Sequence, residues 1–448
     1  MPMKFTRLLL PAAAALLLAG CFGGGGGRHR PGSVPQQPQT PAQPGGAAVP
    51  SGRPQAAGTV HAPSGSGASY RAVSFAELPQ WSSQPFSGSL KSFRQSCTKL
   101  AARPQWSAVC TQAQRTGASD AEARQFFERY FTAWQVSGNG RLDGTVTGYY
   151  EPVLTGDTRM NGRARYPIYG LPADLVSVPL PASLRGSKAV VRVRATGSGS
   201  GQISPSGSHT ANLADFPITE RSSSLKGRFE GSRFVPYYTR AQINSGAIND
   251  RAPVLAYADD PIELFFMHIQ GSGRLRTPDG RFVRLGFADK NEHRYGSIGR
   301  YMADKGYLPL GQTSMQGIKR WMAANPGKLS EVLAQNPSYV FFRQLPGDDS
   351  GPLGALGVPL SGGFSGAVDK RYITLGAPLF VATIHPETRR GLNRLIVAQD
   401  TGSAIKGAVR VDFFWGYGDN AGQSAGKMKD KGYVWMLLPN GMLPEYHP

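Results

Sequence analysis

Short apolar runs bounded by turn-forming residues are the main pattern along this chain. Between residues 152 and 307, Ala189–Val193, Pro253–Tyr257 and Glu263–Ile269 have the length and flanking residues of β-strands. Beyond residue 339 the same pattern predicts five more strands, at Tyr339–Arg343, Leu379–Thr383, Leu395–Ala398, Val409–Trp415 and Tyr433–Leu438. We therefore expect a mainly β protein with short helices, in which a separate β-rich domain precedes a barrel-like C-terminal half.

A few segments carry helical signals instead. Ser119 and Glu122 have the spacing of a capping box, and aromatic residues follow on one helical stripe at Phe126, Phe127, Tyr130, Phe131 and Trp134. Apolar residues at helical spacing are typical of a core, so we interpret the stripe as packing residues rather than as a sugar-stacking surface. Three further short helices are predicted, at Ser297–Lys305, Thr313–Ala324 and Leu329–Ala334.

Glycine-rich segments predict loops and a linker. From Phe22 to Ser69 the chain is mostly Gly, Pro, Gln, Ala and Ser without periodic apolar positions, which predicts a flexible tether. Thr196–His209 is rich in Gly and Ser and predicts an exposed insertion. Thr145–Pro152 predicts a strand that runs into a glycine turn at Gly148, with two tyrosines at its end that are candidates for ligand contact.

The composition supports this β-rich interpretation. At roughly 100–200 residues per domain, 448 residues predict two or three domains. The 57 glycines and 35 prolines make 92 residues in total, which argues against an all-α fold. The formal net charge of +20 indicates an anionic partner or surface, such as anionic lipid, cell-wall polymer or nucleic acid.

The N-terminus predicts export and lipidation. Lys4 and Arg7 precede the apolar run Leu8–Leu18, which is too short to span a bilayer and is typical of a signal peptide at residues 1–20. Small residues stand directly before Cys21, as at a bacterial lipoprotein processing site, so we expect an acylated Cys21 followed by the tether at residues 21–69. Phe22 directly after Cys21, instead of Asp, suggests sorting to the periplasmic face of the outer membrane.

The remaining cysteines and the histidines bear on metal sites. Cys97 and Cys110 form an even pair in an exported protein, which predicts a disulfide. The chain has no HExxH or CxxC motif and its seven histidines are scattered, so we expect no metal and no cofactor. The basic residues are likewise dispersed, and without a nucleic-acid-binding motif we expect no nucleic-acid partner.

Three aspartates near predicted strand ends are the candidate catalytic groups. Asp400 precedes Thr401-Gly402, as in a turn in which the carboxylate accepts from its own backbone. Asp412 lies inside a predicted strand and precedes Phe413, Phe414 and Trp415, which could desolvate the carboxyl and keep it protonated as a general acid. From the residues alone, an ordinary paired or exposed strand aspartate is an equally good interpretation of Asp412.

These residues carry a resemblance to a known family. The segments around Asp369, Asp400 and Asp412, with Thr147–Pro152, Met267–Gly273, Asn291–His293 and Ser297–Gly299, resemble the membrane-bound lytic transglycosylase A family of peptidoglycan-cleaving lipoproteins and are close to its Neisseria-type members. The resemblance covers nearly all of residues 70–448. It implies a double-psi β-barrel catalytic domain formed by residues 70–151 and 307–448, with the three-aspartate "3D" segment at about 365–440. It also implies an inserted glycan-binding β domain at residues 152–306.

The resemblance also implies roles for individual residues. Asp412 corresponds to the catalytic acid/base, and Asp400 and Asp369 to supporting acids. Thr147, Gly148, Tyr149, Gln270 and Ser272 fall in motifs that resemble those lining the glycan groove. Gly148, Gly271 and Gly273 would permit close approach of a ligand, and Gln270 can hydrogen-bond sugar hydroxyls.

The implied reaction is lytic cleavage of the β-1,4 bond between N-acetylmuramic acid and N-acetylglucosamine, which leaves 1,6-anhydro ends. The implied partners are peptidoglycan strands, a membrane through the lipid anchor, and cell-wall synthesis proteins as candidates. Two alternatives remain at this stage. A hydrolytic muramidase would use Asp412 with a second carboxylate, and a non-enzymatic wall-binding lipoprotein would need only the groove and the charge.

Overall fold

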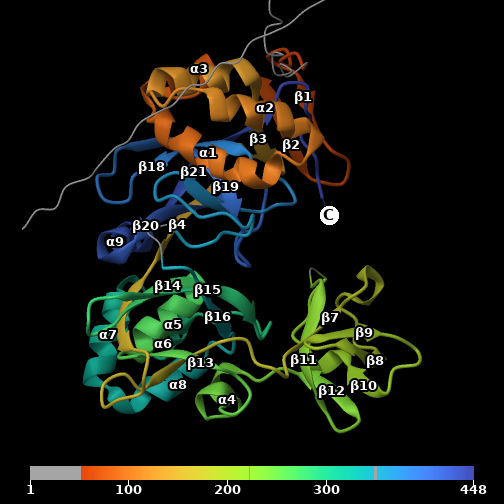
Figure 1. The fold of residues 1–448 in the computed structure, drawn as a ribbon, viewed down its shortest axis with the longest axis vertical. Coiled ribbons are helices and arrows are strands. Elements are labelled where there is room, and N and C mark those ends of the chain that lie inside the picture. Colours follow the sequence, from red (N-terminus) through yellow and green to blue (C-terminus); the bar gives the residue numbers. More distant parts are fainter. Residues whose placement is uncertain (1–51, 221, 348–350, 448) are drawn as a thin grey trace, which may run out of the picture. The chain divides into compact units, whose positions relative to one another are not determined.

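The computed structural model describes residues 52–220, 222–347 and 351–447, and residues Ala47–Pro448 form one compact unit. The predicted signal peptide, Cys21 and most of the predicted tether lie outside the described residues. The predicted end of the tether at Ser69 is wrong, because residues 60–61 and 68–69 already pair within the first sheet. Within the described ranges, no helix combines the length and the apolar character that a membrane span requires. The protein is mainly β with short helices, as predicted (Figure 1).

The first sheet joins the two ends of the described chain. Its nine strands run in the order β1-β2-β3-β21-β18-β19-β17-β20-β4, and β21 also pairs with β4. This last pairing closes a ring of strands from β21 round to β4 that mixes parallel and antiparallel neighbours. The double-psi path stays a prediction. The strands are β1 (Val60–His61), β2 (Ala68–Val73), β3 (Phe131–Gly138), β4 (Gly144–Glu151), β17 (Ser365–Val368), β18 (Pro378–Ile384), β19 (Gly391–Asp400), β20 (Arg410–Tyr417) and β21 (Lys429–Pro439).

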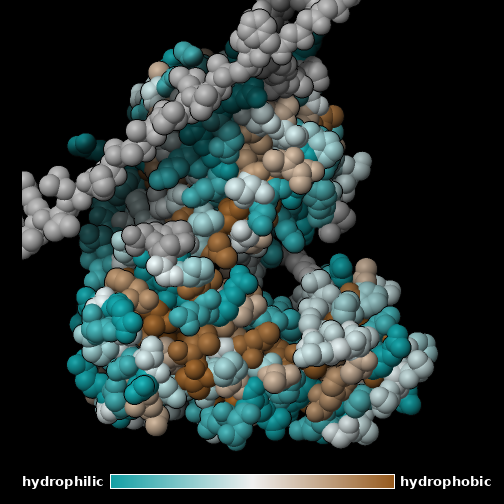
Figure 2. Space-filling model, in the orientation of Figure 1, coloured by the Kyte–Doolittle hydropathy of each residue, from teal (hydrophilic) through white to brown (hydrophobic). Residues whose placement is uncertain are grey.

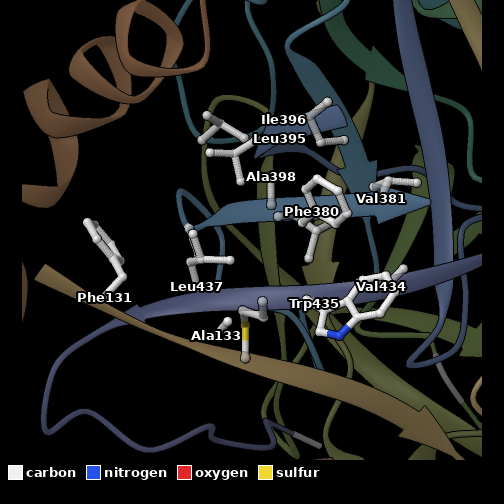
Figure 3. Close-up of a cluster of buried hydrophobic side chains, with 14 of the residues drawn as sticks. Phe131, Ala133, Phe380, Val381, Leu395, Ile396, Ala398, Val434, Trp435 and Leu437 are labelled. Carbon is white, nitrogen blue, oxygen red and sulfur yellow. The ribbon is translucent and has the colours of Figure 1, made fainter. Parts of the chain in front are cut away.

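Large side chains fill the core of this sheet. Figure 3 shows Phe131 and Ala133 from β3, Phe380 and Val381 from β18, and a group from β19 and β21 that includes Leu395, Ile396, Trp435 and Leu437. These side chains come from the two ends of the sequence. The core therefore forms only when the N-terminal and C-terminal segments pair.

Three helices pack on this core: α1 (Phe86–Leu100), α2 (Pro104–Arg115) and α3 (Asp120–Tyr130). The predicted capping box at the start of α3 is present. The predicted helical stripe is partly wrong, because the helix ends at Tyr130, whereas Phe131 and Trp134 belong to β3. These two aromatics have helical spacing in the sequence, but β3 pairs with both β2 and β21, and this pairing decides their structure. Both side chains are buried as part of the strand.

A disulfide joins Cys97 in α1 to Cys110 in α2. The bridge closes a loop with a sequence separation of 13 residues. Replacing both cysteines with alanine is expected to lower the free energy of unfolding by about 3 kcal/mol, because the open loop gains conformational entropy in the unfolded chain. Urea unfolding of the double variant, with the reduced wild-type protein as the matched control, measures this. Equal unfolding midpoints for the oxidised wild type and the double variant would contradict it.

The second sheet lies in the middle of the sequence, with strand order β16-β15-β14-β5-β13-β6. Its strands are β5 (Val153–Asp157), β6 (Tyr166–Tyr169), β13 (Val254–Ala258), β14 (Ser272–Arg276), β15 (Phe282–Lys290) and β16 (Val340–Gln344). Its helices are α4 (Arg240–Asn244), α5 (Pro261–Gln270), α6 (Ile298–Asp304), α7 (Met315–Ala324) and α8 (Leu329–Ala334). The domain boundary predicted at residue 307 is therefore misplaced. Because β16 pairs with β15, the chain rejoins the first sheet only at β17.

Helix α5 occupies the segment predicted as the strand Glu263–Ile269. The Asp260 side chain caps its N-terminus by accepting from the N–H groups of Ile262 and Glu263, and Pro261 takes the first turn. Gly271 ends the helix with a φ of 80°. The run resembles a strand in the sequence because apolar residues follow one another almost without interruption, including Ile269, which is 39% exposed, and this removes the period that distinguishes the two structures.

A third sheet forms a closed barrel in the order β10-β12-β11-β7-β9-β8. The strands are β7 (Val176–Pro179), β8 (Val190–Gly197), β9 (Ser200–Ile203), β10 (His209–Asn212), β11 (Ser224–Glu230) and β12 (Arg233–Pro236). The segment Thr196–His209 is largely exposed, as predicted, but it contains strand residues of this barrel and is not an insertion. It turns between β8 and β9 and leads into β10. The inserted region consequently holds two sheets, where one β domain was predicted.

The remaining elements are short. Helix α9 (Gly418–Lys427) follows β20 and packs against β4 through the cluster of Tyr150, Ala421 and Ala425. Single-turn 3-10 helices lie at Phe75–Glu77, Trp81–Ser83, Ala182–Leu184, Leu213–Asp215, Leu310–Gln312 and Pro326–Lys328.

Candidate active site

Asp412 is the centre of a hydrogen-bonded chain between two neighbouring strands. It lies in β20 directly opposite Thr147 in the parallel strand β4 (Figure 1). The Thr147 hydroxyl donates to Asp412 Oδ1 at 2.5 Å, and Arg410 Nη2 donates to the same hydroxyl at 2.8 Å. Arg410 and Asp412 are two residues apart in one strand and so project from the same face. The half-buried carboxyl is therefore held by a relay from Arg410 through Thr147.

Asp400 is held by a second contact between a hydroxyl group and a carboxyl group. It is the last residue of β19, and Tyr149 of β4 donates its hydroxyl to Asp400 Oδ2 at 3.0 Å. The Ala355 N–H donates to the other carboxyl oxygen at 2.9 Å. The Tyr149 ring also packs beside Phe414, with ring centroids 5.1 Å apart. The same strand β4 thus presents one polar side chain to each aspartate.

The strand register brings the two aspartates to one place. Ala367 of β17 stands opposite Asp412 on one side and opposite Asp400 on the other. Neighbouring strands are about 4.8 Å apart, so the two aspartate Cα atoms lie roughly 10 Å apart across the small Ala367 side chain. Residues in register project to the same face, and the two carboxyls therefore share one site.

Both carboxyls favour the protonated form more than a solvated aspartic acid does. Burial raises the pKa of Asp412, and the charge of Asp400 raises it further, against the opposing effects of the Thr147 hydrogen bond and the Arg410 charge. Burial also raises the pKa of Asp400, although the N–H groups of Thr401 and Ala355 and the Tyr149 hydroxyl act in the other direction. A carboxyl with a raised pKa can act as a proton donor at a higher pH than usual.

Asp369 differs from the other two aspartates. It is 2% exposed and pairs with Arg371, whose Nη2 lies 2.6 Å from Asp369 Oδ2. The Gly407 N–H also donates to this carboxylate, at 2.9 Å. Burial would raise its pKa, but Arg371 and the backbone N–H groups outweigh burial and hold the pKa below its usual value. Asp369 is thus an ionised group that fastens two loops together.

Two of the glycines predicted to permit close approach of a ligand, Gly148 and Gly273, have packing roles in the structure. A Cβ at Gly148 would lie 2.7 Å from the Trp415 ring nitrogen and 2.9 Å from the Ala425 Cα, so Gly148 admits Trp415 and α9. Gly148 is also inside β4 and not in a turn. A Cβ at Gly273 would meet the Met267 sulfur at 2.4 Å, and Gly271 supplies the left-handed end of α5.

Gln270 and Ser272 approach β4 from the second sheet. Gln270, the last residue of α5, accepts from the Tyr150 N–H through Oε1 at 3.2 Å, which brings it next to Tyr149 along β4. Ser272 begins β14 opposite Gly286 and is 9% exposed. Of the predicted substrate-binding residues, Thr147 and Tyr149 contact the aspartates, while Gln270 contacts the backbone of the same strand.

The sequence analysis missed two features of this region, Arg410 and a buried ion pair. Arg410 could have been recognised, because it stands two residues before Asp412 in a predicted strand and so lies on the same face. The buried ion pair between Glu151 and Arg274 had no such signal, since its partners are distant in sequence. No cluster of three or more metal-ligating side chains occurs in the described parts of the chain.

Comparisons with known proteins agree with this geometry. Residues 145–343 match the model of the MltA specific insert domain, and residues 364–438 match that of the 3D domain. The Escherichia coli K12 membrane-bound lytic murein transglycosylase A is 30% identical over 331 residues, which cover 72% of this chain and 73% of that protein. The insert model ends inside β16, where the second sheet also ends.

Solved structures extend the match. The crystal structure of MltA from Neisseria gonorrhoeae is 63% identical, with a TM-score of 0.82, and covers 92% of this chain and all of that chain. The structure of Escherichia coli MltA with bound chitohexaose is 27% identical, with a TM-score of 0.55, and covers 79% of this chain and 89% of that one. This chain therefore belongs to the membrane-bound lytic murein transglycosylase A family and is a peptidoglycan lytic transglycosylase.

Proposed function

We propose that this enzyme cleaves the β-1,4 bond between N-acetylmuramic acid and N-acetylglucosamine with a single general acid/base, Asp412, and leaves 1,6-anhydro-N-acetylmuramic acid ends. The observation that carries the proposal is the half-buried Asp412 carboxyl, whose pKa is raised and which Thr147 and Arg410 hold in place. That an Escherichia coli relative was solved with chitohexaose, an oligosaccharide, supports a glycan as the ligand.

The proposed chemistry balances without an enzyme nucleophile. Protonated Asp412 gives its proton to the glycosidic oxygen as the bond to the muramic acid anomeric carbon breaks. The 6-hydroxyl of the same sugar bonds to that carbon, and the Asp412 carboxylate takes the hydroxyl proton. The nucleophile is intramolecular and so has a high effective concentration. The acid is regenerated in the same step sequence, and no water is consumed.

Asp400 and Asp369 have supporting roles in this proposal. The charge of Asp400 raises the pKa of Asp412 and so favours the proton donor. Asp369, ionised beside Arg371, cannot protonate a leaving group and stabilises the loops behind β17 and before β20. Thr147 and Tyr149 face the reacting sugars in this arrangement, and Gln270 and Ser272 border them from the second sheet.

Product analysis tests the reaction. Mass spectrometry of fragments from purified peptidoglycan should find anhydro ends, which are lighter than reducing ends by one water. Reducing ends would instead indicate a hydrolytic muramidase in which Asp400 activates a water, an alternative favoured by the nearness of the second carboxyl. Products with reducing ends only would overturn the proposed mechanism.

The pH dependence of kcat/KM should shift in opposite directions in two variants. Activity requires protonated Asp412 and falls as the pH rises through its pKa. Thr147→Val removes a hydrogen bond that lowers this pKa, so the decline of kcat/KM should begin at a higher pH in this variant. Asp400→Asn removes a charge that raises the pKa, so the decline of kcat/KM should begin at a lower pH in this variant. Initial rates over a pH series measure both declines, and shifts of both variants in one direction would be inconsistent with Asp412 as the titrating acid.

We also propose that acylated Cys21 anchors the enzyme at the periplasmic face of the outer membrane, where the segment between Cys21 and β1 would let it reach peptidoglycan and cell-wall synthesis proteins. Cys21→Ser should move the protein from the membrane fraction to the soluble periplasmic fraction without changing its specific activity. Fractionation followed by immunoblotting measures this, with the wild-type protein as the control that keeps the anchor. Unchanged membrane retention of Cys21→Ser would refute the anchor.

A further inference from the structure

A cavity of about 480 Å³ lies in the second sheet region, apart from the two aspartates. It is bordered by α4, α5, α8 and β6, and its volume falls in the range of about 300–1,000 Å³ that is usual for small-molecule sites. Figure 2 shows hydrophobic residues gathered over the part of the surface that carries α5 and β13 in Figure 1. None of the described residues that line the cavity is acidic.

Arg240 supplies a buried positive charge at this cavity. The residue is 3% exposed and no described carboxylate lies within ion-pair distance of it. Three of its five N–H groups donate, to the carbonyls of Asn336 and Ser338 and to His268 Nδ1. The other two have no acceptor among the described residues. Burial lowers the pKa of Arg240 to about 10, which leaves the guanidinium charged at neutral pH.

His268 adds an unused donor beside this charge. Because a guanidinium only donates, Nδ1 of His268 must accept, which places the proton of the neutral ring on Nε2. Nε2 is buried and has no hydrogen-bond partner. Burial, together with the neighbouring Arg240, lowers the pKa of His268 and keeps the ring neutral. The cavity is therefore lined by one cation and one neutral ring, and no acidic residue among its described lining matches the cation.

We infer that this cavity binds the carboxylate of a short peptide, with the two spare Arg240 N–H groups as a bidentate clamp that His268 holds in place from the other side of the guanidinium. A single guanidinium matches a single planar carboxylate. The walls fit the rest of a peptide, since Tyr166 and Phe265 offer aromatic surface and Asn244 and Asn249 offer amides. The Phe265 and Tyr339 rings lie against the guanidinium, with centroids 4.7 and 5.0 Å from its carbon, but a carboxylate would add the opposite charge that a buried cation favours.

The choice of probe rests on the proposed function, because wall glycan carries peptides that end in a carboxylate. The probe is acetyl-Lys-D-Ala-D-Ala, compared with its C-terminal amide by isothermal titration calorimetry on the whole protein. We expect the amide to bind about tenfold more weakly or worse, since loss of a charged hydrogen-bond pair costs at least about 1.4 kcal/mol. Equal affinity for the two peptides, or no binding of either, would overturn the inference.

Variants locate the site. Asn244→Trp and Ser330→Trp place bulk at exposed positions that line the cavity and should abolish binding. Arg240→Gln should weaken it at least about tenfold, like the amide, whereas the exposed Arg159→Gln, with the same loss of charge, should not. If Arg240→Gln does not fold, the two tryptophan variants and the amide still decide. Binding that survives both tryptophan variants would refute this location.

Further measurements distinguish free from glycan-attached peptide and separate this proposal from the proposed reaction. A disaccharide carrying the same peptide should bind as well as the free peptide if the ligand is attached to glycan, and more weakly if the site takes free peptides only. Inorganic phosphate that binds as tightly as the peptide would refute a carboxylate site. Asp412→Asn should bind the peptide as the wild type does. Failure to find anhydro products would overturn the proposed reaction without affecting this binding, so the two outcomes are distinguishable.

Discussion

Asp412→Asn is expected to abolish the release of anhydro-muropeptides while leaving the fold intact. The amide keeps the shape of the side chain and can still accept from Thr147, but it has no proton to give to the glycosidic oxygen. General acid/base catalysis contributes about 10²–10⁴-fold, so turnover should fall by at least that factor. Rates of anhydro-product release from purified peptidoglycan, measured by mass spectrometry, test this.

Asp400→Asn and Asp369→Asn are the matched controls. Each removes one carboxylate of the same three-aspartate region. Asp400→Asn should retain measurable activity with a changed pH profile, because it acts on the pKa of Asp412. Asp369→Asn should act through stability, because it loses half of the Arg371 ion pair. Near-native turnover of Asp412→Asn, or a folded but inactive Asp400→Asn at every pH, would show that the acid has been assigned wrongly.

Arg274→Met should destabilise the protein more than any other single change discussed above. Glu151 is fully buried at the end of β4, and Arg274 Nε lies 2.8 Å from its Oε2. Breaking a buried pair leaves an uncompensated charge and costs about 3–5 kcal/mol. Arg274 also lies over the Tyr417 ring, at 4.1 Å from its centroid, so the methionine keeps only part of that contact. Urea unfolding measures the loss.

The pH dependence of this loss identifies its cause. Burial already raises the pKa of Glu151 against the opposing effect of Arg274, and without Arg274 the pKa rises further. A carboxyl whose folded pKa is raised binds its proton more tightly in the folded state. The loss of folding free energy caused by Glu151 is therefore greatest at high pH. It declines as the pH falls toward the pKa of a glutamate in the unfolded chain, about 4.3. The double variant Glu151→Leu/Arg274→Met should recover most of the stability. A pH-independent deficit would point to lost packing instead.

Local features of the fold could be predicted from the sequence because they depend on neighbouring residues. The capping box at Ser119 needs only Glu122 three residues later, and the helix of residues 329–334 needs only its own spacing. Strands such as β18 and β21 can be recognised in the sequence by their runs of apolar residues, which are buried in the structure. The predictions fail where distant pairing overrides local preference, as at Phe131 and Trp134, or where apolar residues on more than one face of a helix obscure the helical period, as in α5.

The candidate site divides in the same way. The sequence alone determined that an aspartate within an aromatic strand, at Asp412, is a candidate acid, because its surroundings are its own neighbours in the chain. Only the tertiary structure decided that Thr147 meets Asp412 and that Tyr149 meets Asp400, because these contacts join residues more than 250 positions apart through the register of β4, β20 and β19. The structure also shows that Asp369 pairs with Arg371 and does not belong to the site that Asp400 and Asp412 share. Strand register is a property of the whole closed sheet, and a one-residue shift would turn these side chains to the opposite face.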